Sequence, residues 1–147
     1  MSVKVVKVTS EYHGEWLRLR NAVYTGIGRT FHEQEMVLYL RDDTKECFLA
    51  ISENGDACGM IEVSLRNVVD GCLTSPVGYV EGIYVDPEYR GSSLARRLLE
   101  RAESWCRSKG CSEVATDAEL DNQDAQRFHE RMGFEETYRI VEYRKEL

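Results

Sequence analysis

The loop from Arg90 to Ala95 has residue types that can hold an anion. It follows an apolar, strand-like run that ends at Asp86-Pro87, and it precedes leucines at helical spacing. Gly91, Ser92 and Ser93 open that helix, where the first backbone N–H groups lack partners within the helix, and Arg90 adds a fixed positive charge. Phosphates bind at such helix starts. An ordinary capped helix after a β-turn explains the same residues, so the loop alone leaves both interpretations open.

Two carboxylates stand in or beside expected strands. Glu81 lies inside an otherwise apolar run, where a charge is costly unless a site uses it, and Asp117 ends the β-rich run from Ser112. The segment from Cys111 to Asp124 holds five acidic residues and no basic one. Such a surface suits a cation, and either carboxylate can accept a proton directly or through water.

Metal and thiol chemistry are not indicated by the spacing. The five cysteines are odd in number and most lie in apolar runs, so we expect a reducing compartment and no structural disulfide. His13 and His32 show no ligand spacing with the cysteines, so we expect no metal. A nucleotide-binding P-loop is excluded because no Gly-Lys-Ser/Thr follows a strand.

The composition predicts one domain. A chain of 147 residues that is 42% apolar is the size of a single domain, here 1–147. Its net charge of −7 argues against DNA or RNA as a partner. No apolar run is long enough to cross a membrane, and the first residues lack the apolar core of a signal peptide, so we expect a cytoplasmic protein without a membrane partner.

The expected elements alternate between strands and helices. The early ones are a strand near residues 3–8, a helix capped by Ser10, and a second helix whose Thr30 and Glu33 have capping-box spacing. Later strands are expected at 47–51, 57–65, 77–85 and 112–117, and the Asn54-Gly55 pair predicts a hairpin between the first two. Two further helices are expected at 92–108 and 122–132, and residues 134–143 are expected to form one long strand or two short ones. The order β-α-α-β-β-β-α-β-α-β-β predicts a mixed α+β sheet with helices on its faces.

This order, with an anion-ready loop between the fourth strand and the long helix, resembles the GCN5-related N-acetyltransferases (GNAT) over essentially the whole chain. The family's loop pattern is Gln/Arg-x-x-Gly-x-Gly/Ala; Arg90 and Ala95 match it, and Ser93 stands where the family has its internal glycine. Finer similarity points to the aminoglycoside 6′-N-acetyltransferase branch. It rests on segments that include Trp16, Leu19-Arg20, Ser64-Leu65-Arg66, Asp70-Gly71-Cys72, Ser75-Pro76-Val77, Glu81-Gly82-Ile83-Tyr84-Val85, Lys109-Gly110-Cys111, Asp117 and Gly133-Phe134-Glu135-Glu136-Thr137.

The resemblance implies that acetyl-CoA lies in a gap between a splayed fourth and fifth strand. The fourth strand would form hydrogen bonds to the pantetheine arm as a neighbouring strand would. Asn122 would contact the same arm, and an ordinary helix N-cap is the alternative interpretation of this residue. His129 stands where many relatives have a tyrosine that protonates the departing thiolate; a helix-surface histidine is the alternative. The implied acetyl-CoA residues are Ile83, Tyr84, Val85, Arg90, Gly91, Ser92, Ser93, Leu94, Ala95 and Asn122.

The same resemblance implies an aminoglycoside as the acceptor, bound by Tyr24, Val68, Glu81, Asp117 and Tyr138. Glu81 or Asp117 would also take the proton of the attacking amine, in direct transfer within a ternary complex. Carboxylates that capture an ammonium group also favour its charged form, so the best binder need not be the best base.

Two alternatives remain open at this stage: the same chemistry on a polyamine or a protein N-terminus, and a non-catalytic acyl-CoA-binding module. The acidic segment from Cys111 to Asp124 favours a small polycation over a protein terminus, and Glu81 and Asp117 argue against a non-catalytic module. Relatives are commonly dimers, and the β-rich segment from Thr137 to Tyr143 is a candidate interface for a homodimer.

Overall fold

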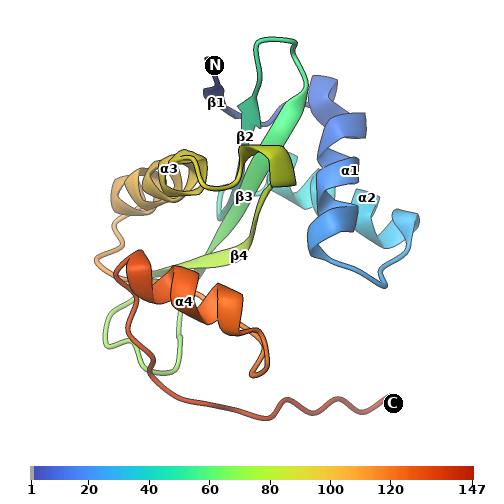
Figure 1. The fold of residues 1–147 in the computed structure, drawn as a ribbon. Helices are drawn as coiled ribbons and strands as arrows, with labels where there is room; N and C mark the ends of the chain where they lie inside the picture. The colour runs from blue at the N-terminus through green and yellow to red at the C-terminus, as the bar shows by residue number, and fades with distance from the viewer. Residues whose placement is uncertain (1) are drawn as a thin grey trace.

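The computed structural model describes residues 2–147, which form one five-stranded sheet with helices on both faces (Figure 1). Strands β1 to β4 pair in chain order as antiparallel neighbours, and β5 adds to β4 in parallel. This is the expected α+β fold. The elements are β1 (Lys4–Lys7), η1 (Ser10–Tyr12), α1 (His13–Val23), α2 (Arg29–Arg41), β2 (Lys45–Ile51), β3 (Ala57–Arg66), β4 (Val77–Val85), η2 (Pro87–Tyr89), α3 (Leu94–Ser108), β5 (Val114–Ala115) and α4 (Gln123–Arg131).

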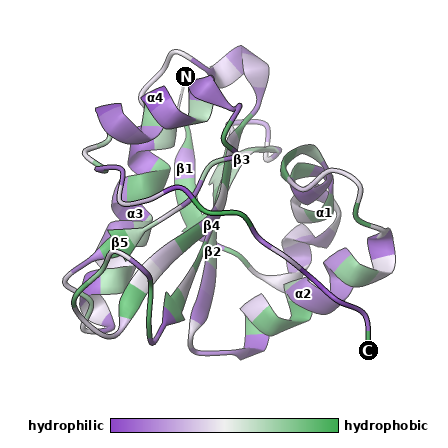
Figure 2. Ribbon diagram, turned by 90° about the horizontal axis from the view of Figure 1, so that it is seen from below, coloured by the Kyte–Doolittle hydropathy of each residue, from purple (hydrophilic) through white to green (hydrophobic). Residues whose placement is uncertain are grey.

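The period-two alternation of the strands divides the core between the two faces. In β2, Phe48 and Ala50 pack toward α3, whereas Cys47, Leu49 and Ile51 pack toward α1 and α2. Figure 2 shows α3 and α4 on one side of the sheet and α1 and α2 on the other. No helix among residues 2–147 combines the length and the apolar character that a membrane span requires.

Helix α3 lies unusually close to β4 because the strand presents a glycine to it. A Cβ built on Gly78 would lie 2.2 Å from Cys106 Sγ and 3.0 Å from Cys106 Cβ, and Cys106 is buried. Gly78 also pairs with Val114, the first residue of β5. The glycine therefore keeps the helix, β4 and the start of β5 together.

Replacing Gly78 with alanine is expected to lower the free energy of unfolding by about 1–3 kcal/mol, the usual cost of overpacking a core. Urea denaturation followed by circular dichroism measures the change. Gly14→Ala is the matched control, since nothing lies within 4 Å of a Cβ at that position. A Gly78→Ala protein as stable as the control would contradict the close packing of α3 on β4.

Two predicted helix caps are wrong. Ser10 lies inside the short helix η1, and neither η1 nor α1 has a side-chain hydrogen bond at its N-cap. Thr30 lies inside α2, whose N-cap is Gly28, and Glu33 pairs with Arg29 rather than forming a capping box. Packing of the apolar faces of α1 and α2 on the sheet, rather than caps, stabilises these helices.

The late elements are shorter than predicted. Helix α3 begins at Leu94 rather than Ser92, and β5 has two residues where six were expected. Residues 134–143 form no strand in the described chain; the C-terminal segment runs as an extended chain below the sheet (Figure 1), with Ile140, Val141 and Tyr143 exposed. Their β-propensity needs a partner strand, and the two-residue edge of β5 offers too little backbone to pair with.

Candidate active site

A β-bulge on β4 presents Glu81. Glu62 of β3 pairs with Gly82 and Val63 pairs with Val80, so Glu81 is an extra residue between two paired positions. The Glu81 carboxylate accepts a hydrogen bond from Ser64 Oγ at 2.5 Å and lies 3.0 Å from Arg66 Nη2 through each of its oxygens. The costly charge inside an apolar strand is thus explained by a local break in the strand, which turns the carboxylate toward polar neighbours.

Asp117 is tied to the same group of side chains through Tyr79. The Tyr79 hydroxyl donates a hydrogen bond to Asp117 Oδ2, and the Arg66 guanidinium lies 3.5 Å from the centroid of the Tyr79 ring. Burial and the neighbouring Asp117 carboxylate raise the pKa of Tyr79, which keeps its hydroxyl a donor. The structure therefore connects Glu81 and Asp117, predicted separately from the sequence, through Arg66 and Tyr79.

Tyr24 lies against the bulge from the α1 side. A Cβ on Gly82 would lie 2.2 Å from the Tyr24 hydroxyl, so glycine is needed for the ring to approach the strand. The hydroxyl donates to Glu62 Oε1 at 2.9 Å, and burial is the main cause that raises the pKa of Tyr24. Tyr24 therefore packs directly against Gly82, the residue after Glu81, and its hydroxyl is committed to Glu62 of β3.

A buried ion pair between Arg20 and Glu62 holds Tyr24 in place, because Glu62 also accepts the hydrogen bond of the Tyr24 hydroxyl. The side chains of Glu62 and Arg20 are each 1% exposed, and Arg20 Nη1 lies 2.5 Å from Glu62 Oε2. Trp16 Nε1 also donates to Glu62, at 2.9 Å, and Arg20 Nε donates to His32 Nδ1 at 3.1 Å. Burial raises the pKa of Glu62, while the guanidinium and the Trp16 and Tyr24 donors favour its charged form. The network holds the end of α1 against the bulge.

Beyond Tyr79 the strands β4 and β5 separate. They pair only at Gly78–Val114 and Tyr79–Ala115, after which Thr116 Oγ1 donates to the Val80 carbonyl at 3.0 Å. In the described chain, residues 83–85 of β4 pair with β3 on one side and with no strand on the other. Side chains fill the gap at this separation and leave no room for a water molecule between them; they belong to Val80, Ile83, Leu99, Thr116, Phe128, His129 and Phe134.

The loop before α3 has the geometry of a tight turn into a helix. Gly91 adopts φ +80°, a left-handed conformation that favours glycine. Ser92 Oγ donates to the Tyr89 carbonyl at 2.5 Å and accepts from the Leu94 N–H at 3.3 Å. Arg90 Nε donates to the Val85 carbonyl at 2.9 Å, which folds the arginine back onto the end of β4. The loop is thereby joined to the open stretch of β4.

His129 lies in α4, and Asn122 directly precedes the first residue of that helix. The His129 ring lies 5.6 Å from the ring of Phe128 and 5.6 Å from that of Phe134. Its Nδ1 is buried without a hydrogen-bond partner among the described residues, and burial lowers the pKa of the imidazole. Asn122 accepts a hydrogen bond from the Ala125 N–H at 3.1 Å, so it is an N-cap of α4.

Val68 and Tyr138 lie on two segments that touch each other. Both side chains are exposed, and the segments meet where a Cβ on Gly71 would lie 2.5 Å from Thr137 Cβ. Glu113 anchors the loop before β4 by accepting hydrogen bonds from the Thr74 hydroxyl and from the Leu73 and Thr74 N–H groups. The bond from the hydroxyl is the main cause that lowers the pKa of Glu113, and the N–H groups add to it. The structure places both predicted contacts outside the hydrogen-bonded group around Glu81.

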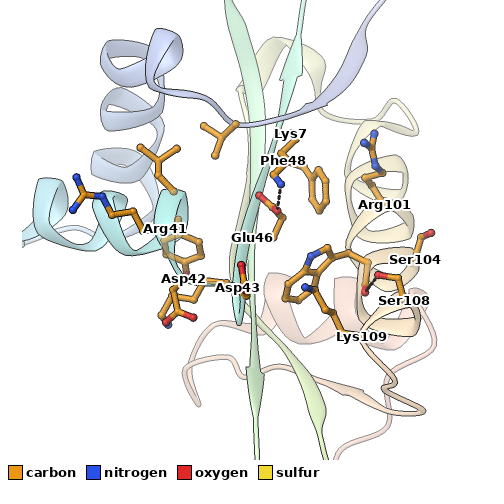
Figure 3. Close-up of a pocket in the computed structure, with 15 residues that line it drawn as sticks. Lys7, Arg41, Asp42, Asp43, Glu46, Phe48, Arg101, Ser104, Ser108 and Lys109 are labelled. Atoms are coloured by element: carbon orange, nitrogen blue, oxygen red, sulfur yellow. Dashed lines mark hydrogen bonds and ion pairs between the residues drawn. The ribbon is translucent and has the colours of Figure 1, made fainter.

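A cavity of about 460 Å³ lies elsewhere, between the C-terminal ends of α2 and α3 beside β2 (Figure 3). Its buried carboxylate, Glu46, is already satisfied by the Cys47 N–H and by Lys7 Nζ at 3.2 Å. None of the site residues predicted from the sequence lines it. We therefore assign the chemistry to the β4 bulge and the β4–β5 separation rather than to this larger cavity.

Several residues of the site were not predicted. Glu62, Tyr79 and the roles of Ser64 and Arg66 became visible only through the register of β3 on β4. The sequence does contain a signal that could have grouped these residues, because residues two apart in a strand lie on the same face of the sheet. Tyr79 and Glu81 have this spacing in one strand, and Ser64 and Arg66 have it in the strand before. The bulge itself has no such signal in the sequence.

Comparison with known proteins decides the family. The model of the acetyltransferase (GNAT) family matches residues 12–134. The chain belongs to the GNAT family. An aminoglycoside N(6′)-acetyltransferase type 1 from Acinetobacter genomosp. 13 is 37% identical over 146 residues, which cover 99% of each chain.

Solved structures of GNAT proteins share the fold over the full length. The structure of AAC(6′)-Iy in complex with the bisubstrate analogue CoA-S-monomethyl-acetylneamine superposes with a TM-score of 0.94 at 32% identity and covers 100% of both chains. AAC(6′)-Iy in complex with CoA gives a TM-score of 0.94 at 32% identity, covering 99% of this chain and 96% of that one. The predicted GNAT fold is thus confirmed.

Proposed function

We propose that this GNAT protein transfers the acetyl group of acetyl-CoA to the 6′-amine of aminoglycoside antibiotics and so confers resistance to them. The observation that carries the proposal is the pair of linked carboxylates, Glu81 and Asp117, beside the separation of β4 and β5. An aminoglycoside carries several ammonium groups near neutral pH, and such a pair attracts them. Full-length similarity to aminoglycoside N(6′)-acetyltransferases supports the same substrate.

The donor side of the site suits acetyl-CoA. In the described chain, residues 83–85 of β4 pair with no strand on the edge that faces β5. Their backbone groups on that edge would bond the pantetheine arm, except for the Val85 carbonyl, which accepts from Arg90. The turn at Gly91 and the N–H groups that open α3 would hold the pyrophosphate, together with Ser92, Ser93, Leu94 and Ala95. Arg90 lies at this turn with its fixed charge, and Asn122, the N-cap of α4, would contact the arm.

In the proposed reaction the neutral 6′-amine attacks the thioester carbonyl carbon. A C–N bond forms, the C–S bond breaks, the extra proton on nitrogen passes to Glu81 or Asp117 or to water between them, and the CoA thiolate takes a proton. A backbone N–H of β4 stabilises the charge that develops on the carbonyl oxygen. Tyr24, Val68 and Tyr138 would contact the drug around these carboxylates.

His129 is our candidate for the acid that protonates the thiolate, with solvent as the other source. It lies among the side chains that fill the separation of β4 and β5, and its buried Nδ1 is free of protein partners among the described residues. Because burial lowers the pKa of its imidazole, the protonated form is scarce at neutral pH but gives up its proton readily.

A cysteine-linked acetyl-enzyme is not favoured. Burial raises the pKa of Cys106 to about 12 and raises the pKa of Cys47 and Cys58 as well. The nucleophilic thiolate is therefore suppressed at these positions. Direct transfer within a ternary complex agrees with this and with the bisubstrate analogue bound to AAC(6′)-Iy.

We also propose that the protein works as a homodimer in the cytoplasm, where acetyl-CoA is available. The segment from Thr137 to Tyr143 leaves several apolar side chains uncovered, among them Tyr138, Ile140 and Val141. A second copy of the chain could cover them, since an apolar patch of this kind often marks an interface. Sedimentation analysis of the full chain distinguishes a dimer from a monomer.

Thiol release from acetyl-CoA tests the function. Neomycin and paromomycin are the matched pair, because they differ at the 6′ position as amine and hydroxyl. Turnover with neomycin, kanamycin and tobramycin but not with paromomycin is expected. Turnover only with spermidine or an N-terminal peptide would keep the acetyltransferase chemistry and overturn the proposed substrate, and binding of acetyl-CoA without any turnover would favour an acyl-CoA-binding module.

A further inference from the structure

Arg66 occupies the position where a substrate ammonium group would meet Glu81. Its Nη2 lies 3.0 Å from both oxygens of the Glu81 carboxylate, and its guanidinium covers the Tyr79 ring at 3.5 Å from the centroid. The arginine is the last residue of β3, and its side chain is 44% exposed. A fixed positive charge therefore stands within the proposed acceptor site.

The need to orient the Glu81 carboxylate does not by itself explain why an arginine stands at position 66. Ser64 Oγ already donates to Glu81 Oε2, and the bulge sets the direction of the side chain. An exposed ion pair of this kind adds little stability. The electrostatic effect of Arg66 on a bound substrate is the larger consequence of its position.

The proposed reaction places two opposing demands on the charge around the substrate amine, and the charge of Arg66 affects the balance between them. Carboxylates that attract an ammonium group also favour its protonated form, yet only the neutral amine can attack the thioester. A guanidinium held on the same carboxylate acts in the opposite direction, because a like charge nearby disfavours the ammonium form. Arginine suits this task since it keeps its charge at every pH of interest.

Resting on the proposed function, we propose that Arg66 partly neutralises Glu81 so that the bound amine gives up its proton near neutral pH, and that Arg66 competes with the substrate for this carboxylate. It is a positioning and charge-balancing residue rather than a proton carrier. The other charged or titratable groups that face this region come from five parts of the chain: Glu62 of β3, Tyr79 of β4, Asp117 after β5, Arg20 and Tyr24 at and just after the end of α1, and Glu35 and Tyr39 of α2.

The test compares wild type and Arg66→Met in two measurements. The first is the single-turnover rate of acetyl transfer to saturating kanamycin between pH 6 and pH 9.5. Without the guanidinium, the rising part of the profile is expected to move up by about one pH unit, the usual effect of one charge a few ångströms away. The rate at pH 7 then falls about tenfold and recovers above pH 9.

The second measurement is calorimetric binding of kanamycin at pH 7 in the absence of acetyl-CoA. Arg66→Met is expected to bind about 2- to 5-fold more tightly, since the competing cation of an exposed pair is gone. Arg66→Lys keeps the charge and is expected to restore the wild-type profile. Arg29→Met, which removes an exposed arginine paired with Glu33 on α2, is the matched control and is expected to change neither measurement.

A profile for Arg66→Met that superimposes on the wild-type profile would overturn the proposal, as would weaker binding of kanamycin. The proposed function and the role of Arg66 are refuted by different results. Wild-type protein that turns over no aminoglycoside refutes the proposed function, whereas wild-type turnover with an unshifted variant refutes only the role of Arg66.

Discussion

Replacing Glu62 with alanine is expected to lower the free energy of unfolding by about 3–5 kcal/mol, the usual cost of leaving one partner of a buried ion pair unpaired. Glu62 accepts hydrogen bonds from Trp16, Arg20 and Tyr24, and its side chain is 1% exposed. The substitution leaves the Arg20 guanidinium buried with Glu35 as its one charged partner among residues 2–147. Since domains of this kind are stable by about 5–15 kcal/mol, the loss takes a large share of the total.

Urea denaturation at pH 7 measures this loss. Glu33→Ala is the matched control, because Glu33 pairs with Arg29 on the surface of α2 and is expected to change stability by about 0–1 kcal/mol. The double variant Arg20→Met with Glu62→Leu is expected to be more stable than Glu62→Ala, since it buries no unpaired charge. A Glu62→Ala protein no less stable than Glu33→Ala would show that the network does not carry this part of the fold.

Glu81→Gln is expected to lower kcat/KM for aminoglycosides by about 10²- to 10⁴-fold, the range for removing a group that positions or accepts the transferred proton. The amide keeps the shape of the side chain and removes its charge, so both the attraction for the ammonium group and the proton acceptor are lost. The residue lies in a bulge with its side chain 26% exposed, and therefore a much smaller effect on folding is expected.

Steady-state thiol release with kanamycin measures this effect, and thermal unfolding verifies that the variant is folded. Glu100→Gln removes a carboxylate from the exposed face of α3 and is expected to retain wild-type activity. A Glu81→Gln enzyme as active as Glu100→Gln would remove Glu81 from the reaction. The acceptor role would then rest on Asp117.

The sequence predicted the sheet well because its strands carry strong local signals. The run from Val77 to Val85 is a strand with the predicted bounds, and Asn54-Gly55 forms the predicted hairpin turn, with Gly55 at φ +85°. The stop signal at Lys109-Gly110 is also correct. These features depend on neighbouring residues, which a sequence displays directly.

What the sequence did not predict depends on distant residues. The bulge at Glu81 follows from the register of β4 against β3, and the Arg66–Glu81 and Tyr79–Asp117 pairs join residues 15 and 38 positions apart. The buried pair of Arg20 and Glu62 spans 42 positions, so no spacing rule could link the two residues. The absence of the late strand in the described chain has a similar cause, since a strand requires a partner that local propensity cannot supply.

The position of the transferred acetyl group decides whether the protein is a 6′-N-acetyltransferase. Kanamycin is incubated with the purified protein and acetyl-CoA labelled with ¹³C in the acetyl group, and two-dimensional NMR of the product locates the new amide. The account predicts a single acetyl group on the 6′ nitrogen. An acetyl group on another amine of the drug, or unmodified kanamycin alongside acetylated spermidine from a parallel reaction, would contradict it.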